Sequence, residues 1–328
     1  MLVFLPCVVV KITITTCPIL SYLGHTSNTL NLPVNKTNKK LIFCSGYGRL
    51  GNRLYRLCYA IAIAKEYGYK VLDYTFYHHG YSDYFESTLR SLFFCWPKSR
   101  KNYALLLKIP YIRQVLENAM RLRYKRSNKV NAEHEAFDLC GFIERHNYPN
   151  TVILDGLHFR SDSLIEKYEC EIKSAFNVRS LIKVNAIKNL AVNIENYDYI
   201  IGLHVRHGDY KTWANGAYYI PLKDYCEHAQ KVLKKKASSR SLVIIFSDEE
   251  QVVKSMAAED IIPYNGTEIE SLYIMSLCDV IIGPAISTFS GFAAFLGGAE
   301  LHRLKQVKGT IKAMKVDPKS LNNEDPFK

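Results

Sequence analysis

The chain has 328 residues, of which 48% are hydrophobic and 23% charged. This composition excludes an intrinsically disordered chain, a collagen-like repeat and a protein with many membrane spans. The 43 basic and 31 acidic residues give a formal charge of +12, which fits either a solvated basic surface or binding to phosphates, nucleic acid or acidic lipids. Nine scattered cysteines form no Cys-x-x-Cys pair, so a zinc site is not expected.

The first 40 residues are expected to be an apolar leader followed by a polar linker. Residues 2–23 are mostly apolar but contain Pro6, Lys11 and Pro18. A spanning helix needs about 20 apolar residues without a central charge. Two interpretations therefore stay open for this segment: a weak membrane anchor, or a poorly formed signal peptide or disordered leader.

A first α/β domain is expected over residues 41–190. The apolar run Leu41–Ser45 predicts a strand, and Asn52–Tyr67 has helical periodicity with a glycine as its stop signal. A second strand is expected at Tyr69–Asp73, which makes a βαβ unit and predicts a parallel sheet. Further along, a strand is expected at Thr151–Asp155 and a helix at Ser163–Phe176.

A second α/β domain is expected over residues 191–300, followed by a basic C-terminal tail at 301–328. Strands are expected at Tyr199–Val205, Leu242–Phe246 and Val280–Gly283, and helices at Pro221–Lys236, Glu249–Glu259, Glu270–Leu277 and Thr288–Leu296. Two α/β halves predict a ligand in the crevice between them, at the carboxyl ends of the strands.

A glycine-rich loop lies between the first strand and the first helix, at Gly46–Asn52. Its glycines allow a sharp turn and a close approach to a ligand, and the following helix offers free N–H groups to an anion. The pattern is neither a Walker loop nor GxGxxG, so a simple strand–helix turn explains it equally well.

The segment His204–Tyr210 follows a predicted buried strand. His204 and Arg206 face the same side of an extended chain, and the planar guanidinium fork suits a phosphate. Asp209 is expected either to hold Arg206 or to cap the next segment. A purely structural Arg–Asp pair is the alternative, whereas a metal site is disfavoured because no acidic partner has useful spacing.

The segment Ser287–Gly291 precedes the last predicted helix. Its hydroxyl groups are good helix caps, and together with the helix N–H groups they also form a phosphate cradle. Capping alone and anion binding are both left open.

In combination, these segments resemble glycosyltransferase family 11, the α-1,2-fucosyltransferases. Gly48–Leu54 is similar to the G-[GR]-L-G-N-Q-[LM]-F-Q loop, and His204–Tyr210 to the H-x-R-x-G-D-Y motif. Weaker matches are Asp155–Ser161, Phe246–Asp248, Ser271–Cys278 and Ser287–Ser290, all in the family's order. The chain departs from the pattern at Arg53, Arg56, Arg160, Ile286, Gly291 and Phe292, which are expected around the acceptor pocket.

The resemblance implies a GT-B-like α/β fold, in which two Rossmann-like domains face a central cleft. It also implies inverting transfer of L-fucose from GDP-fucose, the donor substrate, to a galactose-type hydroxyl, with no cofactor and no essential metal. The sequence has no Asp-x-Asp between apolar strands, so protein cations are expected to neutralise the departing GDP.

The resemblance also assigns roles to residues. Arg206 is expected to bind the pyrophosphate, and the helix start with Ser287, Thr288 and Ser290 is expected to be a second anion site. The remaining donor-site residues are His204 and Glu270 for the nucleoside, Asp248, and Gly51 with Asn52 lining the crevice. Asp209 and His158 are the candidate catalytic bases, and each can equally be structural.

The expected partners are a nucleotide-sugar donor and a glycan acceptor. Another nucleotide-sugar transferase and an inactive relative are nearby alternatives, and a basic nucleic-acid or lipid-surface binding protein is the alternative of a different class. No RNA-binding motif is present and aromatics are not interleaved with the basic runs, so nucleic acid is not expected. If residues 2–23 are an anchor, membrane association as a Golgi-type single-pass type II protein is expected; otherwise the protein is expected in the cytoplasm.

Overall fold

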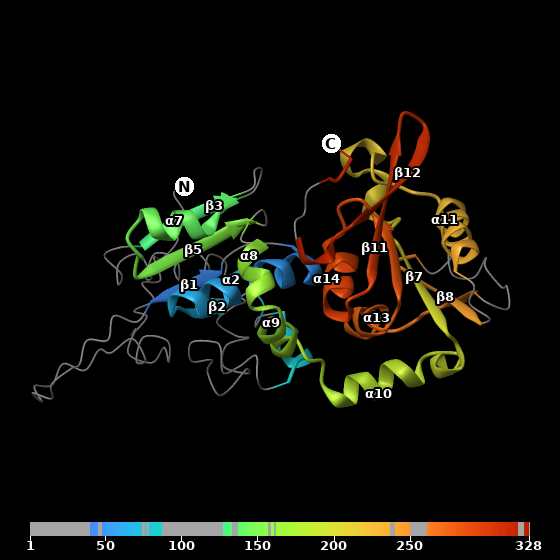
Figure 1. The fold of residues 1–328 in the computed structure, drawn as a ribbon, viewed down its shortest axis with the longest axis horizontal. Helices are drawn as coiled ribbons and strands as arrows, with labels where there is room; N and C mark the ends of the chain where they lie inside the picture. Colours follow the sequence, from blue (N-terminus) through green and yellow to red (C-terminus); the bar gives the residue numbers. More distant parts are fainter. Residues whose placement is uncertain are drawn as a thin grey trace, which may run out of the picture.

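The computed structural model describes residues 40–44, 48–73, 76, 79–86, 127–132, 137–156, 159–160, 162–236, 240–249, 261–320 and 325–327. The expected leader at residues 2–23 and nearly all of the helix expected at Glu249–Glu259 lie outside them. The described residues form two α/β lobes, an N-lobe running from β1 to α9 and a C-lobe running from β7 to β12 (Figure 1). In this part of the chain, no helix is long and apolar enough to cross a membrane.

The N-lobe is built on a four-stranded parallel sheet in the order β2-β1-β5-β3. Its strands are β1 (Leu41–Cys44), β2 (Lys70–Asp73), β3 (Ser127–Ala132) and β5 (Thr151–Gly156). Helix α2 (Leu50–Tyr67) connects β1 to β2 and ends at Gly68, whose φ of 71° is the left-handed conformation that glycine adopts easily. The predicted βαβ unit is confirmed.

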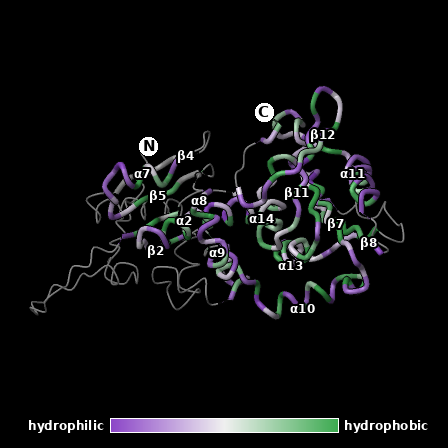
Figure 2. Tube along the Cα trace, viewed as in Figure 1, coloured by the Kyte–Doolittle hydropathy of each residue, from purple (hydrophilic) through white to green (hydrophobic). Residues whose placement is uncertain are grey.

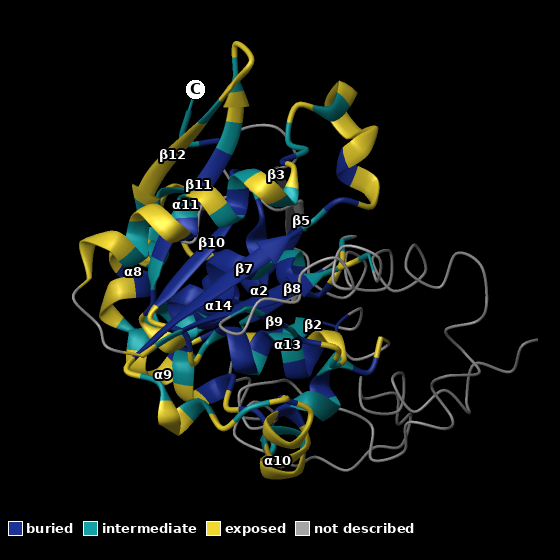
Figure 3. Ribbon diagram, turned by 90° about the vertical axis from the view of Figure 1, so that its right-hand side faces the viewer, coloured by how far each residue is buried: buried dark blue, intermediate teal, exposed yellow. Residues whose placement is uncertain are grey.

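Smaller elements complete the N-lobe and lead to the C-lobe. They are η2 (Tyr81–Tyr84), β4 (Phe137–Asp138), α7 (Leu139–Arg145), β6 (Phe159–Arg160), α8 (Asp162–Lys167), α9 (Glu169–Ala175), α10 (Ser180–Lys188) and η3 (Ile194–Asn196). Helix α10 is mostly exposed and runs from the N-lobe along the C-lobe (Figures 1 and 3).

The C-lobe is built on a six-stranded sheet in the order β12-β11-β10-β7-β8-β9. Its strands are β7 (Tyr199–Val205), β8 (Ser241–Ser247), β9 (Ile261–Pro263), β10 (Val280–Pro284), β11 (Glu300–Val307) and β12 (Thr310–Val316). Every residue of β7 and β10 is buried, as expected for central parallel strands covered on both faces (Figure 3).

Helices cover both faces of the C-lobe sheet. The helical elements are η4 (Asp209–Lys211), η5 (Trp213–Gly216), α11 (Leu222–Lys235), α13 (Glu268–Met275), α14 (Thr288–Gly297) and η6 (Pro318–Ser320). The strands β7 and β8 are hydrophobic along their length, whereas α11 is largely hydrophilic on the outside of the lobe (Figure 2).

The C-terminal residues expected in a basic tail instead extend the C-lobe sheet. Strand β11 pairs in parallel with β10, and β12 pairs antiparallel with β11 at the sheet edge. Leu301 and Leu304 of β11 are buried, but the basic residues between and after them mask this pattern in the sequence. Exposed lysines are favourable on an edge strand, where they discourage pairing with another chain.

The two lobes share one hydrophobic core. Helix α2 of the N-lobe packs against α14 of the C-lobe, and a single cluster of buried side chains runs through both. Phe176, at the end of α9, meets Phe292 of α14 edge to face with ring centroids 5.1 Å apart. This contact between the lobes fixes the junction at which the candidate site lies.

Candidate active site

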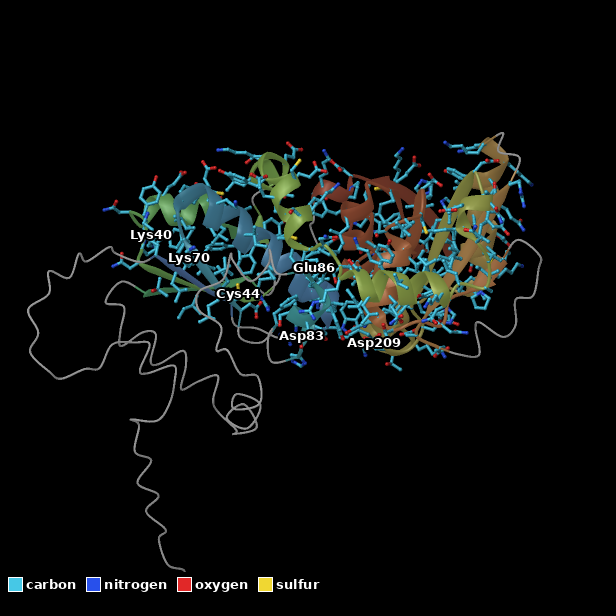
Figure 4. The ribbon with its side chains drawn as sticks, turned by 90° about the horizontal axis from the view of Figure 1, so that it is seen from below. Lys40, Cys44, Lys70, Asp83, Glu86 and Asp209 are labelled. Carbon is cyan, nitrogen blue, oxygen red and sulfur yellow. The ribbon has the colours of Figure 1, made fainter. Side chains whose placement is uncertain are left out.

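The predicted site residues gather where the carboxyl ends of β7, β8 and β10 face the beginning of α2. Strand β7 ends just before Arg206, and β10 leads through a short turn into α14. Ligands of open parallel sheets bind at this edge. Asp209 lies toward the junction of the two lobes, on the same edge of the view as Asp83 of the N-lobe (Figure 4).

Arg206 and Asp209 form a two-point ion pair at the start of the loop after β7. Arg206 Nε donates to Asp209 Oδ1 at 2.9 Å, and Nη2 donates to Oδ2 at 2.8 Å. The Arg206 guanidinium also lies over the ring of Tyr210, 4.9 Å from its centroid. This pairing lowers the pKa of Asp209, so its carboxylate is a weak proton acceptor. The structural interpretation of Asp209, as the partner of Arg206, is therefore preferred over catalytic base.

His204 lies under the first turn of α14. Its Nδ1 is 3.1 Å from the Ser287 hydroxyl, and the side chain is buried. Burial, with Arg206 and Arg303 nearby, lowers the pKa of His204 to about 3. A buried neutral imidazole bonded to a helix cap holds that helix in place, so this contact differs from the nucleoside contact expected of His204.

Helix α14 begins over a buried cation. Ser287 is the N-cap, and its hydroxyl accepts from the backbone N–H of Ser290 at 3.4 Å. Arg303 of β11 donates through Nη1 to Ser287 O at 2.8 Å, Pro284 O at 3.2 Å and Ser290 Oγ at 3.0 Å. Ser287 and Ser290 are buried and engaged in these contacts, which hold the first turn of α14, and the anion site expected there stays a prediction. Arg303 was not predicted from the sequence, because it lies among the basic residues assigned to a tail.

The N-lobe reaches the same point through the first turn of α2. The Thr288 hydroxyl donates to Asn52 Oδ1 at 2.7 Å, which joins the amino ends of α14 and α2. A Cβ on Gly51 would lie 2.8 Å from both the Phe289 nitrogen and Thr288 Oγ1, so only glycine allows the two helices this close. Two positive helix ends therefore converge beside Arg206, an arrangement that suits an anion.

Two of the acidic residues expected in the donor site hold a loop and a helix end, and their contact with the donor stays a prediction. Asp248 Oδ1 accepts from the backbone N–H groups of His207 at 2.9 Å and Gly208 at 3.3 Å, which holds the loop that carries Arg206. Glu270 Oε2 accepts from Thr267 N and Oγ1 at 2.8 and 2.9 Å and closes a capping box on α13. The other candidate base, His158, lies outside the described residues.

Two charged residues at the junction were not predicted. Arg49, from the glycine-rich loop, is close enough to Asp209 of the C-lobe to lower its pKa. Glu268, in the first turn of α13, interacts with Arg49 and with the Tyr81 hydroxyl of the N-lobe, and burial raises its pKa. Both side chains bring charge to the region where the lobes meet.

Two departures from the family pattern face the interior of the N-lobe. Arg53 Nε donates to Gly48 O at 2.7 Å, which fixes the loop before α2. Arg56 pairs with Asp73 at 3.1 Å, and both side chains are fully buried. These contacts hold the glycine-rich loop and the end of β2, and the place of the two arginines beside an acceptor pocket stays a prediction.

The fold and the site together define the class of protein. Two Rossmann-like lobes meet at the carboxyl ends of their parallel strands, which is the GT-B-like architecture of glycosyltransferases. The sequence profile of glycosyl transferase family 11 matches residues 101–312, so the chain belongs to this family. The family and the fold class predicted from the motifs are confirmed.

One solved fucosyltransferase structure shares this fold, and two others match with lower scores. The structure of a point mutant of Arabidopsis thaliana FUT1 in complex with GDP matches with 14% sequence identity and a TM-score of 0.58, over 84% of this chain and 73% of that chain. Fucosyltransferase NodZ from Bradyrhizobium matches with 16% identity and a TM-score of 0.48, over 84% of this chain and 99% of that one. POFUT1 in complex with GDP matches with 12% identity and a TM-score of 0.46, over 80% and 95%. Among curated proteins, no significant sequence match is found.

Proposed function

We propose that the protein transfers L-fucose from GDP-fucose to a galactose-type hydroxyl of a glycan, with an α-1,2 linkage and inversion at the anomeric carbon. The observation that carries the donor assignment is the contact between the amino ends of α2 and α14. Arg206 lies close to this contact, because it acts on His204 under α14 and its partner Asp209 lies near Arg49 at the start of α2. The fold match to a fucosyltransferase bound to GDP supports the same ligand class. The galactose acceptor and the linkage rest on the motifs that resemble the α-1,2-fucosyltransferases.

Glycosyl transfer separates charge: the sugar becomes cation-like while negative charge grows on the diphosphate. Groups that stabilise this growing charge act mainly in the transition state and so raise the rate of the chemical step. In this chain those groups are the free N–H ends of α2 and α14, the Arg206 guanidinium, and the buried Arg303 charge behind α14. With these cations, the departing GDP is neutralised without an essential metal in the proposed reaction.

The ion pair with Asp209 prepares Arg206 for this role. Asp209 occupies the edge of the guanidinium formed by Nε and Nη2. A guanidinium has five N–H donors, so its other edge, between Nη1 and Nη2, retains hydrogens that can bind a phosphate. Asp209 therefore orients the Arg206 guanidinium and holds it against the Tyr210 ring. The second edge then binds the diphosphate of the donor.

A panel of nucleotide sugars tests the donor assignment. We expect GDP-fucose and GDP to raise the melting temperature of the protein more than GDP-mannose or UDP-sugars, because ligands that bind the native state stabilise it. Turnover is then measured with a β-galactoside acceptor, and the product linkage is determined by NMR. Preferential stabilisation by a UDP-sugar would overturn the donor assignment. Stabilisation by GDP-fucose with a product other than α-1,2 would overturn only the linkage.

A further inference from the structure

An aromatic stack extends outward from Arg206 along the loop after β7. Arg206 lies over Tyr210, whose ring stacks with Trp213 at a centroid distance of 5.7 Å and an interplanar angle of 26°. Trp213 in turn lies 5.1 Å from Tyr218, with an angle of 31°. The indole is therefore connected to the guanidinium of the candidate site through a single intervening ring.

The stack is held rigidly by contacts behind it. Tyr210 is buried, and the Tyr218 hydroxyl donates to Asp325 Oδ2 at 3.1 Å. Asp325 is itself buried and forms an ion pair with Lys305 of β11, whose ammonium lies 5.2 Å from the centre of the Tyr218 ring. The C-terminal segment thus fixes one end of the stack, while the Arg206–Tyr210 contact fixes the other.

Trp213 is the exposed member of this stack. It is 49% exposed, although Tyr210 beside it is only 7% exposed. The three residues that follow it, Ala214, Asn215 and Gly216, have φ values of 48°, 55° and 75°. Two consecutive non-glycine residues in the left-handed region cost free energy, and such strain clusters at functional sites. Tyr210 and Tyr218 hold the indole in place, yet it stays half-exposed on a strained turn.

We propose that Trp213 is the platform on which a pyranose ring of the acceptor glycan stacks. One face of a pyranose such as galactose carries several C–H groups with partial positive charge, and an aromatic ring presents a negative face to them. The polar groups behind the platform are already bonded to one another. The half-exposed indole therefore offers apolar ring surface, which suits the C–H face of a sugar better than a nucleobase whose polar edge must be recognised. This inference rests on the proposed function, since Arg206 would hold the donor diphosphate beside it.

Substitution of Trp213 separates acceptor binding from donor binding. We expect Trp213→Ala to raise the KM for a β-galactoside acceptor about two- to tenfold, the factor that corresponds to loss of one aromatic stacking contact. The KM for GDP-fucose and the rate of donor hydrolysis in the absence of acceptor stay close to wild type. Trp213→Phe, which keeps a ring face, restores most of the acceptor affinity. Tyr148→Ala is the matched control, because this 41% exposed aromatic lies just before β5, at the opposite end of the N-lobe sheet.

Two results with these variants would overturn the proposal. If the melting temperature is retained and Trp213→Ala weakens binding of GDP but not of the galactoside, the indole is a nucleobase platform. If neither ligand is affected, the indole has no role in binding. Tryptophan fluorescence gives a second test that requires no donor. We expect β-galactosides to quench the emission of the wild-type protein, and we expect this quenching to be lost in Trp213→Phe. Quenching without any stabilisation by GDP-fucose would refute the donor assignment and keep the sugar platform, whereas no change in emission at saturating galactoside would refute the platform itself.

Discussion

The hydroxyl of Thr288 donates a 2.7 Å hydrogen bond to the side-chain oxygen of Asn52, and this bond joins the amino ends of helices from the two lobes. Each helix end carries unpaired N–H groups and a partial positive charge. Because the bond brings these ends together, the positive electrostatic potentials of the two helix ends add at the junction of the lobes. The relationship gives the proposed diphosphate site its location and explains why residues far apart in the sequence are needed for it.

The contact between these helices depends on Gly51. A Cβ at this position would lie 2.8 Å from atoms of Thr288 and Phe289, so Gly51→Ala must push α2 away from α14. We expect a loss of roughly 1–3 kcal/mol in the free energy of unfolding, measured by urea denaturation, because overpacking of a tight contact has this cost. GDP binding should weaken in the same variant, as measured by calorimetry.

A glycine elsewhere provides the control for this substitution. Gly309, in the β11–β12 hairpin, has a φ of 77° and open space around it. Asparagine adopts that conformation at a smaller cost than other residues, so Gly309→Asn should lower stability less than Gly51→Ala and leave GDP affinity unchanged. Equal effects of the two substitutions would show that the tight helix contact is not the cause.

Replacement of Arg206 tests the need for a planar fork. Arg206→Lys keeps the positive charge but cannot bind Asp209 at two points and a phosphate with a second edge. We expect both Arg206→Lys and Arg206→Ala to lower kcat by about 10²–10³-fold, the usual cost of losing one donor that stabilises transition-state charge. The measurement is single-turnover transfer at saturating GDP-fucose. A lysine variant that keeps most of its turnover contradicts this role.

Arg303→Met tests the buried cation behind α14. The substitution leaves Pro284 O, Ser287 O and Ser290 Oγ without the donor that they share. Pro284 O and Ser287 O still accept from the N–H groups of Ser287 and Gly291. Three hydrogen bonds to a charged donor are lost, however, so we expect a loss of roughly 1–3 kcal/mol in the free energy of unfolding together with weaker GDP binding. Arg145→Met is the control, because Arg145 forms only an exposed ion pair at 3.7 Å with Asp138. An Arg303 variant as stable as this control would refute the structural role.

His204 predicts a dependence of stability on pH. Its pKa is lowered to about 3 in the folded protein from an ordinary value of 6.5. Between these values the unfolded chain binds a proton that the folded chain does not, so the free energy of unfolding falls as the pH drops from about 6.5 toward 3. His204→Asn should flatten this decline by up to about 1.4 kcal/mol per pH unit, as measured by urea denaturation at pH 7, 6 and 5. Parallel pH curves for the two proteins would contradict the assignment.

Local signals in the sequence were sufficient to predict the elements around the site. The helical periodicity that ends at Gly68 and the buried run Tyr199–Val205 both appear in the structure nearly as expected. Such elements are predictable because their apolar spacing and stop residues act within a few residues of each other. The convergence of Arg206, Thr288 and Asn52 followed from the order of strands and helices together with the family resemblance.

Roles that depend on tertiary contacts were not predictable in this way. Asp248 is adjacent to a strand end, but its function is decided by backbone N–H groups of a loop 40 and 41 residues away in the sequence. Arg303 resembles its exposed basic neighbours, and only the pairing of β11 with β10 shows that it is buried under α14. The burial of Arg303 depends on α14, which covers this part of the sheet, and no local pattern of residues 300–307 reports that contact.

The core that runs through both lobes has a consequence for how the molecule can move and be divided. Phe176 and Phe292 pack edge to face across the junction, and the buried apolar cluster around them continues from one lobe into the other. A hinge motion that separated the two lobes would expose this apolar surface to water. The donor and the acceptor must therefore enter a space of fixed width. For the same reason, a fragment that ends or begins near residue 190 would expose a large hydrophobic surface to water. We expect either lobe expressed alone to be insoluble.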